Sequence, residues 1–193
     1  MPHVHIGDSP DRTRIPAGTR TLTGVTIHSD HPFVPPEGDR DPLRRLRGQL
    51  PAPVTVWAAG SGRERRGLTV SSVLVAAGEP AHVLGLVDEE AGLWDEPPTT
   101  LVVNVLRPGH AYLAEAFAGT VPSPGGPFTQ REWGDSEWGP VLADAAAWLG
   151  VRLVAEPPRH VGWGLLLDGV VEHVETTSTE VLTHVRGRYL GGS

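Results

Sequence analysis

From residue 51 onward the chain consists mainly of short runs rich in Val and Leu, and this pattern limits the possible fold more than any other feature. The runs are bounded by Gly, Pro or acidic residues, which is typical of β-strands. They cover residues 54–58, 68–76, 82–87, 101–106, 151–155, 165–174 and 181–189. Because long helices do not alternate with them, the runs predict a mainly β fold, an antiparallel barrel or sandwich, and argue against a doubly wound nucleotide-binding fold.

Two short helices are predicted between these runs. Asp41 and Pro42 suit the N-cap and first position of a helix that ends before Pro51. Residues 109–118 place apolar side chains on one face at helical spacing and are followed by a glycine that can cap the helix. The segment 141–149 is ambiguous, and its alanines favour a short helix that runs into the next strand.

The composition excludes several kinds of site. The chain has no Cys, and all 16 of its basic residues are Arg. Thiol catalysis, disulfides, Cys-bound metals and a lysine Schiff base are therefore excluded, and no metal site is expected. A formal charge of −7 argues against nucleic-acid binding. No apolar run approaches the roughly 20 residues of a membrane span, so we expect a soluble cytoplasmic protein.

Residues 1–40 differ from the rest of the chain. They are rich in Pro, Gly, Asp, Arg and His and show little apolar periodicity. We expect an N-terminal arm that is partly disordered or packed on a neighbour, followed by one folded domain over residues 41–193.

Two polar features interrupt the apolar runs. Gly67 is followed by three hydroxyl side chains within five positions, and a charged turn precedes it. Small hydroxyls beside a glycine let a ligand approach the backbone closely, although they also fit a strand face exposed to solvent. Asn104 lies in the middle of the apolar run 102–106. A buried amide needs hydrogen-bond partners, and the polar edge of a heterocycle would supply them.

Taken in order along the chain, these segments resemble the flavin reductase-like family of FMN-binding split barrels. The matching segments are residues 53–56, 67–72, 83–88, 102–106, 115–119 and 186–189. The resemblance implies an antiparallel Greek-key split β-barrel with a few short helices, and a homodimer. It also implies FMN, with FAD or riboflavin as alternatives, reduced by NAD(P)H and passed on to a partner monooxygenase. A non-catalytic protein that binds flavin or another small ligand on the same barrel is the alternative.

The resemblance also implies a set of site residues. The cofactor-binding candidates are Thr69, Val70, Ser71, Ser72, Asp88, Asn104, Phe117, Arg188 and Tyr189. Reductases of this kind usually carry a His near the nicotinamide, before the last long strand. That position falls at Trp163 in this chain, and His160 lies three residues earlier, so both are catalytic candidates. Packing in the core is an equally good interpretation of Trp163.

Two further segments leave alternatives open. After the strand that ends at Asp88, many family members have a basic or Ser-rich turn that helps to hold the phosphate. This chain has Glu89 and Glu90 there, and their charges would repel a phosphate. Arg65 or Arg66 offers a compensating positive charge. The aromatic residues of the loop 122–138 fit a lid, a dimer contact or a plug at one end of the barrel.

Overall fold

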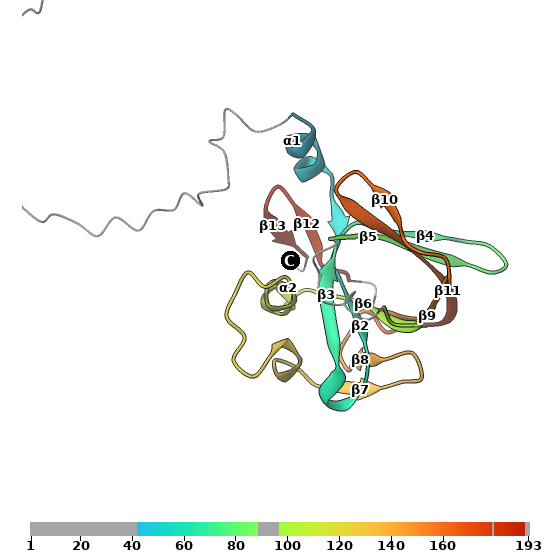
Figure 1. Cartoon of the computed structure of the whole chain (residues 1–193). Helices are drawn as coiled ribbons and strands as arrows, with labels where there is room; N and C mark the ends of the chain where they lie inside the picture. Colours follow the sequence, from blue (N-terminus) through green and yellow to red (C-terminus); the bar gives the residue numbers. More distant parts are fainter. Residues whose placement is uncertain (1–41, 89–96, 179, 192–193) are drawn as a thin grey trace, which may run out of the picture. The chain divides into compact units, whose positions relative to one another are not determined.

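A computed structural model describes residues 42–88, 97–178 and 180–191. Its largest sheet is antiparallel and curls into a half-barrel (Figure 1), so the predicted mainly β split barrel with a few short helices is confirmed. Neighbouring strands follow the order β3–β2–β6–β9–β11–β5–β4, and β10 pairs with β11. Their bounds are β2 Thr55–Ala59, β3 Arg66–Val70, β4 Val73–Ala76, β5 His82–Asp88, β6 Thr100–Val105, β9 Ala147–Leu153, β10 Arg159–Val161 and β11 Gly164–Thr176.

The remaining elements lie outside this sheet. Both predicted helices are present, as α1 Pro42–Gln49 and α2 Ala111–Phe117, although the proposed N-cap Asp41 is outside the described residues. A small antiparallel sheet contains β1 Ala52–Pro53, β12 Thr183–Val185 and β13 Arg188–Leu190. A two-stranded ribbon contains β7 Trp133–Asp135 and β8 Pro140–Leu142, and single 3₁₀ turns occupy η2 Gly62–Glu64 and η3 Pro127–Thr129.

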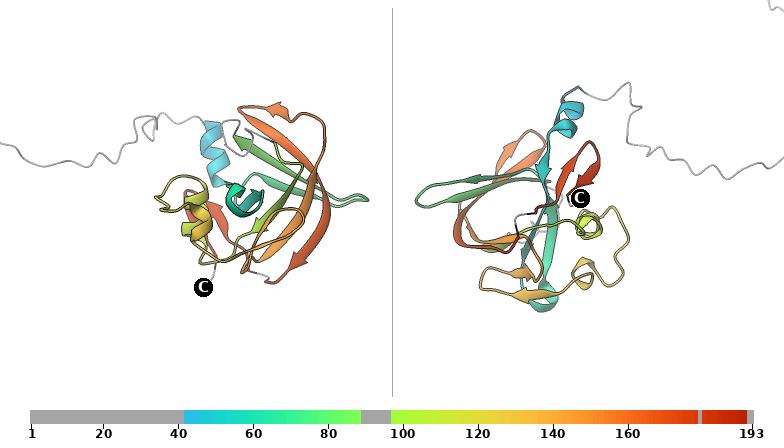
Figure 2. Two further views of the ribbon diagram at one scale, coloured as in Figure 1. Left: turned by 60° about the horizontal axis from the view of Figure 1, so that its bottom comes forward. Right: turned by 180° about the vertical axis from the view of Figure 1, so that it is seen from behind.

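Figure 2 shows from two further sides how the strands of the large sheet curl. One apolar cluster around Trp57 packs between these strands. Trp57 is completely buried, and so are Val83, Leu101 and Val103 from the neighbouring strands. A Cβ at Gly85 would lie only 2.5 Å from Cη2 of Trp57, so a residue without a side chain is required opposite the indole.

A second apolar cluster covers the other face of β2. Val56 and Ala58 point to this side, because successive side chains of a strand alternate between its two faces. They pack with Leu113 and Phe117, which form the buried face of α2. This packing fixes α2 beside β3, the strand that carries the predicted hydroxyl residues.

The alanine-rich segment 141–149 does not form the short helix that its composition favours. It contains the end of β8, a turn, and the first residues of β9. The backbone N–H of Ala146 donates a hydrogen bond to the carbonyl of Val105 at 2.9 Å, and the hydroxyl of Thr177 also bonds this turn. Pairing with the sheet therefore outweighs the small helix preference of alanine.

Two predicted strands are each divided into two. The run 68–76 is interrupted at Ser71 and Ser72, which lie between β3 and β4. The run 181–189 becomes the β12–β13 hairpin, whose turn residues Arg186 and Gly187 have φ values of 51° and 72°. Positive φ at both central residues gives the turn that best matches the twist of paired strands.

Some expectations lie outside the described residues, namely the N-terminal arm over 1–40 and the acidic pair Glu89–Glu90. Within the part of the chain that the structure describes, no helix has the length and apolar character needed to cross a membrane.

Candidate functional site

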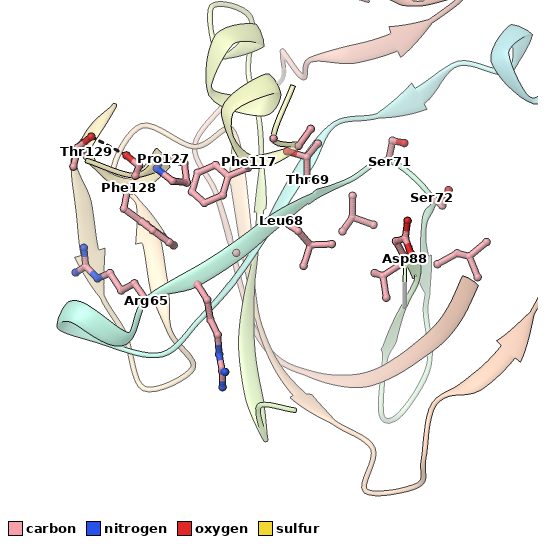
Figure 3. A pocket seen from close by; sticks show the side chains of 18 of the residues that line it. Arg65, Leu68, Thr69, Ser71, Ser72, Asp88, Phe117, Pro127, Phe128 and Thr129 are labelled. Atoms are coloured by element: carbon pink, nitrogen blue, oxygen red, sulfur yellow. Dashed lines mark hydrogen bonds between the residues drawn. The ribbon is translucent and has the colours of Figure 1, made fainter. Parts of the chain in front are cut away.

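A pocket of about 1170 Å³ lies along β3 (Figure 3). It is bounded by the C-terminal end of α2, by residues 125–129 and by the end of β5. Six of the nine predicted cofactor residues line it: Thr69, Val70, Ser71, Ser72, Asp88 and Phe117. Residues that the sequence separates by nearly fifty positions therefore meet around one pocket.

Aromatic side chains form one wall of this pocket. A Cβ at Gly67 would lie 3.1 Å from Cε1 of Phe117, so the ring of Phe117 packs directly on the backbone of β3. The rings of Phe117 and Phe128 meet edge to face with centroids 4.9 Å apart, and Trp133 packs against both. Of the roles considered for the loop 122–138, this packing fits a plug of aromatic side chains beside the pocket.

The three predicted hydroxyl residues differ in their hydrogen bonding. The hydroxyl of Thr69 donates to the backbone carbonyl of Ala114 at 2.7 Å, so its hydrogen ties β3 to α2. The structure records no side-chain hydrogen bond for Ser71 or Ser72 within the described residues, and both line the pocket. A serine hydroxyl can donate one hydrogen bond and accept two. These two hydroxyls are therefore available to a polar ligand.

The amide of Asn104 finds its hydrogen-bond partners within the protein, and its place in the site stays a prediction. Its side chain is completely buried and is absent from the lining of the pocket. The amide donates to the carbonyls of Pro140 at 3.2 Å and Val56 at 3.4 Å, and its oxygen accepts from the N–H of Leu142 at 2.8 Å. The backbone thus supplies the partners that the sequence interpretation assigned to a ligand.

Arg188 and Tyr189 also lie outside the lining of the pocket, on strand β13. Arg188 is exposed. The ring of Tyr189 packs on that of His184 with centroids 5.2 Å apart, and burial, together with a hydrogen bond to Glu115, raises the pKa of Tyr189 above its ordinary range. Neither residue lines the pocket that this chain forms.

The two catalytic candidates lie on the β10–β11 hairpin. His160 is exposed on β10, opposite Leu165 of β11. Trp163 is 100% exposed in the turn of the hairpin, so packing in the core is the wrong interpretation of this residue. Its neighbour Gly164 pairs with Asp88, which lines the pocket. This pairing places the turn of the hairpin near the part of the pocket that Asp88 lines.

The sequence interpretation missed a buried hydrogen-bond network next to α2. His110, directly before α2, is only 1% exposed, and its Nε2 lies 3.1 Å from a carboxylate oxygen of Asp144. Arg107 bonds the same oxygen at 2.9 Å. Burial lowers the pKa of His110, and the hydrogen bond to the carboxylate of Asp144 opposes this only in part. A histidine at the start of the predicted helix 109–118 was the available signal.

The lining suits a flat aromatic ring that carries polar and anionic groups. The pocket combines apolar walls with free serine hydroxyls and several guanidinium groups, and the required glycine at position 67 lets the aromatic wall lie close to β3. No group of three or more His, Asp or Glu within residues 42–88, 97–178 and 180–191 could hold a metal ion.

Comparison with known proteins identifies the class to which this fold and pocket belong. Residues 46–193 match the family model described as the flavin reductase like domain. The match covers well over half of the chain, and the protein is therefore a member of the flavin reductase-like family.

Two characterised relatives are similar in sequence. The chain is 34% identical over 116 residues to an NADH-dependent FAD reductase of Streptomyces globisporus, an alignment that covers 58% of this chain and 63% of that protein. It is 33% identical over 131 residues to the FMN reductase (NADH) RutF of Variovorax paradoxus, covering 65% of this chain and 69% of that protein. The chain thus spans somewhat less than two thirds of the first relative.

Solved structures share the fold. The NADH:FAD oxidoreductase SgcE6 of Streptomyces globisporus, in complex with NAD and FAD fragments, superposes with a TM-score of 0.69 at 28% identity, covering 78% of this chain and 91% of that chain. BorF, the flavin reductase component of a bacterial two-component tryptophan halogenase, gives a TM-score of 0.67 at 20% identity, covering 77% and 95%. The likeness to BorF concerns the fold alone.

Proposed function

We propose that the protein is a flavin reductase that uses NADH or NADPH to reduce FMN or FAD. The observation that carries the proposal is the pocket along β3, in which Ser71 and Ser72 offer free hydroxyls beside the wall formed by Phe117. Family membership supplies the reaction class, and the names of the two relatives, one an FAD reductase and the other an FMN reductase, supply the candidate substrates.

Five of the lining residues have a proposed task. Ser71 and Ser72 donate hydrogen bonds to polar atoms of the flavin, and the backbone of Thr69 and Val70 lies along the same wall. Phe117 excludes water from one side of the pocket. Hydride acceptance from a reduced nicotinamide, with a proton taken from solvent, is the chemistry that a bound flavin supplies.

The β10–β11 hairpin is the proposed place of contact with the nicotinamide. Trp163 projects fully into solvent next to Gly164, which pairs with Asp88. Its indole face is therefore free to stack on a flat ring. His160 is exposed on the same hairpin and is the other candidate. Asn104, Arg188 and Tyr189 have no proposed direct contact, because they lie outside the lining.

The test is to mix the purified chain with FMN or FAD and then with NADH or NADPH in the absence of oxygen. Loss of the visible absorbance of oxidised flavin within seconds supports a reductase. Tight flavin binding without reduction by either nucleotide would instead favour the non-catalytic binding protein.

Variants of the hairpin test the nicotinamide contact. Trp163→Ala should raise the KM for NADH by about two- to tenfold, since a stacked aromatic pair contributes about 0.5–1.5 kcal/mol beyond its buried area. Trp163→Phe should retain most of the affinity, and flavin binding should not change in either variant. A rise in KM that occurs in His160→Ala and is absent from Trp163→Ala would move the role to His160.

Assembly and partner are also part of the proposal. A homodimer is supported by exposed apolar side chains in α1 and directly after it, where Leu43, Leu46 and Leu50 are 69%, 53% and 59% exposed. Sedimentation of the purified chain measures the oligomeric state directly. Transfer of reduced flavin to a partner oxygenase is suggested by the resemblance, and the test is whether reduced flavin leaves the protein faster than it reoxidises.

A further inference from the structure

A second pocket, of about 830 Å³, is lined by residues of β10, β11 and β5. It shares no lining residue with the pocket along β3. Its volume lies within the range of about 300–1,000 Å³ that is typical of sites for small molecules. None of the roles proposed for the flavin pocket or for the β10–β11 turn uses this second pocket.

The connection from β9 to β10 forms one wall of the second pocket. Both strands pair with the same edge of β11, β9 from Gly169 onward and β10 up to Leu166. The five residues 154–158 therefore face only two residues of β11, and they project out of the sheet. Two of them, Pro157 and Pro158, cannot donate hydrogen bonds to a neighbouring strand.

Another pair of prolines, Pro97 and Pro98, also lines the pocket. The next residue, Thr99, is attached to the sheet, because its carbonyl accepts a hydrogen bond from the last residue of β9 at 2.9 Å. Proline rings restrict the backbone and carry no N–H, so both proline pairs present apolar and preformed surfaces. Leu84 and Leu166 add apolar side chains from β5 and β11. The pocket therefore suits the apolar body of a ligand.

Two opposite charges lie on the same face of the sheet at this pocket. Leu166 and Asp168 are two residues apart on β11 and so point to one face, and Arg159 of β10 is paired with Leu166. Diagonal neighbours of this kind are about 7–8 Å apart. Among the described residues no ion pair joins Arg159 to Asp168, whose Oδ1 instead lies 2.6 Å from Nδ1 of His82.

Both charged groups are available to a ligand. The side chain of Arg159 is exposed and has no recorded hydrogen bond or ion pair in the part of the chain that the structure describes. His82 contacts only one carboxylate oxygen of Asp168 and does not line the pocket, so it holds this carboxylate from outside. Glu156 also lines the pocket, which gives a cationic group of a ligand a second possible acceptor.

We propose that this pocket binds a small zwitterion with an apolar body, namely an amino acid with an apolar side chain. The carboxylate of the ligand pairs with Arg159, since a planar guanidinium matches a carboxylate with two parallel hydrogen bonds. The ammonium group donates to the free oxygen of Asp168, and the apolar body packs on Leu166 and the prolines. The inference does not depend on the flavin reductase function, because the two pockets share no residue.

The probes are L-leucine and L-phenylalanine, titrated into the purified chain in a calorimeter. N-acetyl-L-phenylalanine lacks the ammonium group, and L-phenylalanine amide lacks the carboxylate. We expect saturable binding of both amino acids and about tenfold weaker binding of each derivative, which loses one charge-assisted hydrogen bond. No saturable binding of either amino acid, or equal affinity for the amino acid and both derivatives, would overturn the proposal.

Arg159→Gln tests the carboxylate contact on an exposed side chain. It should weaken the binding of L-phenylalanine about tenfold and leave the amide unaffected, because the amide has no carboxylate. Arg188→Gln removes the same charge from an exposed position on β13 that does not line this pocket, and it should bind like the wild type. Equal losses in the two variants would reveal an effect of overall charge, and unchanged binding in Arg159→Gln would equally refute the site.

Asp168→Asn tests the ammonium contact and keeps the shape of the side chain. It should weaken the binding of L-phenylalanine and leave that of the N-acetyl derivative unchanged. Glu175→Gln, at an exposed position on the same strand, is its control. If Asp168→Asn fails to fold, Arg159→Gln decides the question by itself. A raised KM for NADH in Arg159→Gln, with unchanged amino-acid binding, would overturn the site and assign Arg159 to the nicotinamide nucleotide.

Discussion

Replacement of Asn104 by Leu separates a structural role of this residue from a role in flavin binding. The side chain of Asn104 is fully buried and bonds three backbone groups, those of Val56, Pro140 and Leu142. Leu has the same number and branching of side-chain heavy atoms but no polar atoms, so Asn104→Leu leaves the buried N–H of Leu142 and the carbonyl of Pro140 without this partner.

The expected loss of stability follows from these bonds. A buried polar group that loses its partner costs roughly 1–3 kcal/mol, and the weaker bond to Val56, at 3.4 Å, adds little. We therefore expect the free energy of unfolding to fall by about 3 kcal/mol. At about 2–4 °C per kcal/mol for a domain of this size, Tm should fall by roughly 6–12 °C.

The assay combines thermal unfolding with flavin binding well below the transition. Asn104→Leu should lower Tm and leave the flavin dissociation constant of the folded protein unchanged. Thr100→Val, a substitution of similar shape on the same strand, serves as control and should stay within about 0.5 kcal/mol of the wild type. An unchanged Tm, or weaker flavin binding at unchanged Tm, would refute the structural assignment and restore a place for Asn104 in the site.

Two further predictions concern packing and pH. Gly85→Ala should lower the free energy of unfolding by about 1–3 kcal/mol in denaturant titrations, because a Cβ would lie 2.5 Å from the indole of Trp57. An unchanged free energy of unfolding would mean that the core shifts to accommodate the added methyl group. Burial lowers the pKa of His110 below its ordinary value of 6.5, so the unfolded chain binds more protons and stability should fall as pH drops below about 6.5. His110→Gln should flatten this dependence, and an identical pH profile in both proteins would contradict the assignment.

The fold was largely predictable because its signals are local. Short runs of β-branched and apolar residues bounded by Gly and Pro favour strands whatever the surrounding tertiary structure. Both predicted helices also begin and end close to the expected residues. The segment 141–149 was the exception. Its alanines favour a helix only weakly, and the hydrogen bond of Ala146 to β6 decides the matter through a residue 41 positions away.

The candidate site was only partly predictable. Thr69 to Ser72 and Phe117 could be proposed together because the resemblance to the flavin reductase-like family assigns both segments to one site. In the sequence, an Asn that binds a ligand looks the same as an Asn that bonds the backbone. The residues around Asn104 therefore do not reveal that the backbone of β8 supplies partners for its amide. The exposure of Trp163 was equally hidden, because an aromatic before a strand suits a core and a hairpin turn alike.

The sequence by itself determined the class of fold, the family and the segment of β3 on which the proposed site rests, because these depend on side-chain types and their order. Tertiary structure alone decided which polar groups remain available. The hydroxyl of Thr69 is used by α2 and the amide of Asn104 by β8, whereas the hydroxyls of Ser71 and Ser72 line the pocket. The physical reason is that hydrogen-bond partners and shared pockets arise from residues far apart in the chain, and a sequence does not record their distances.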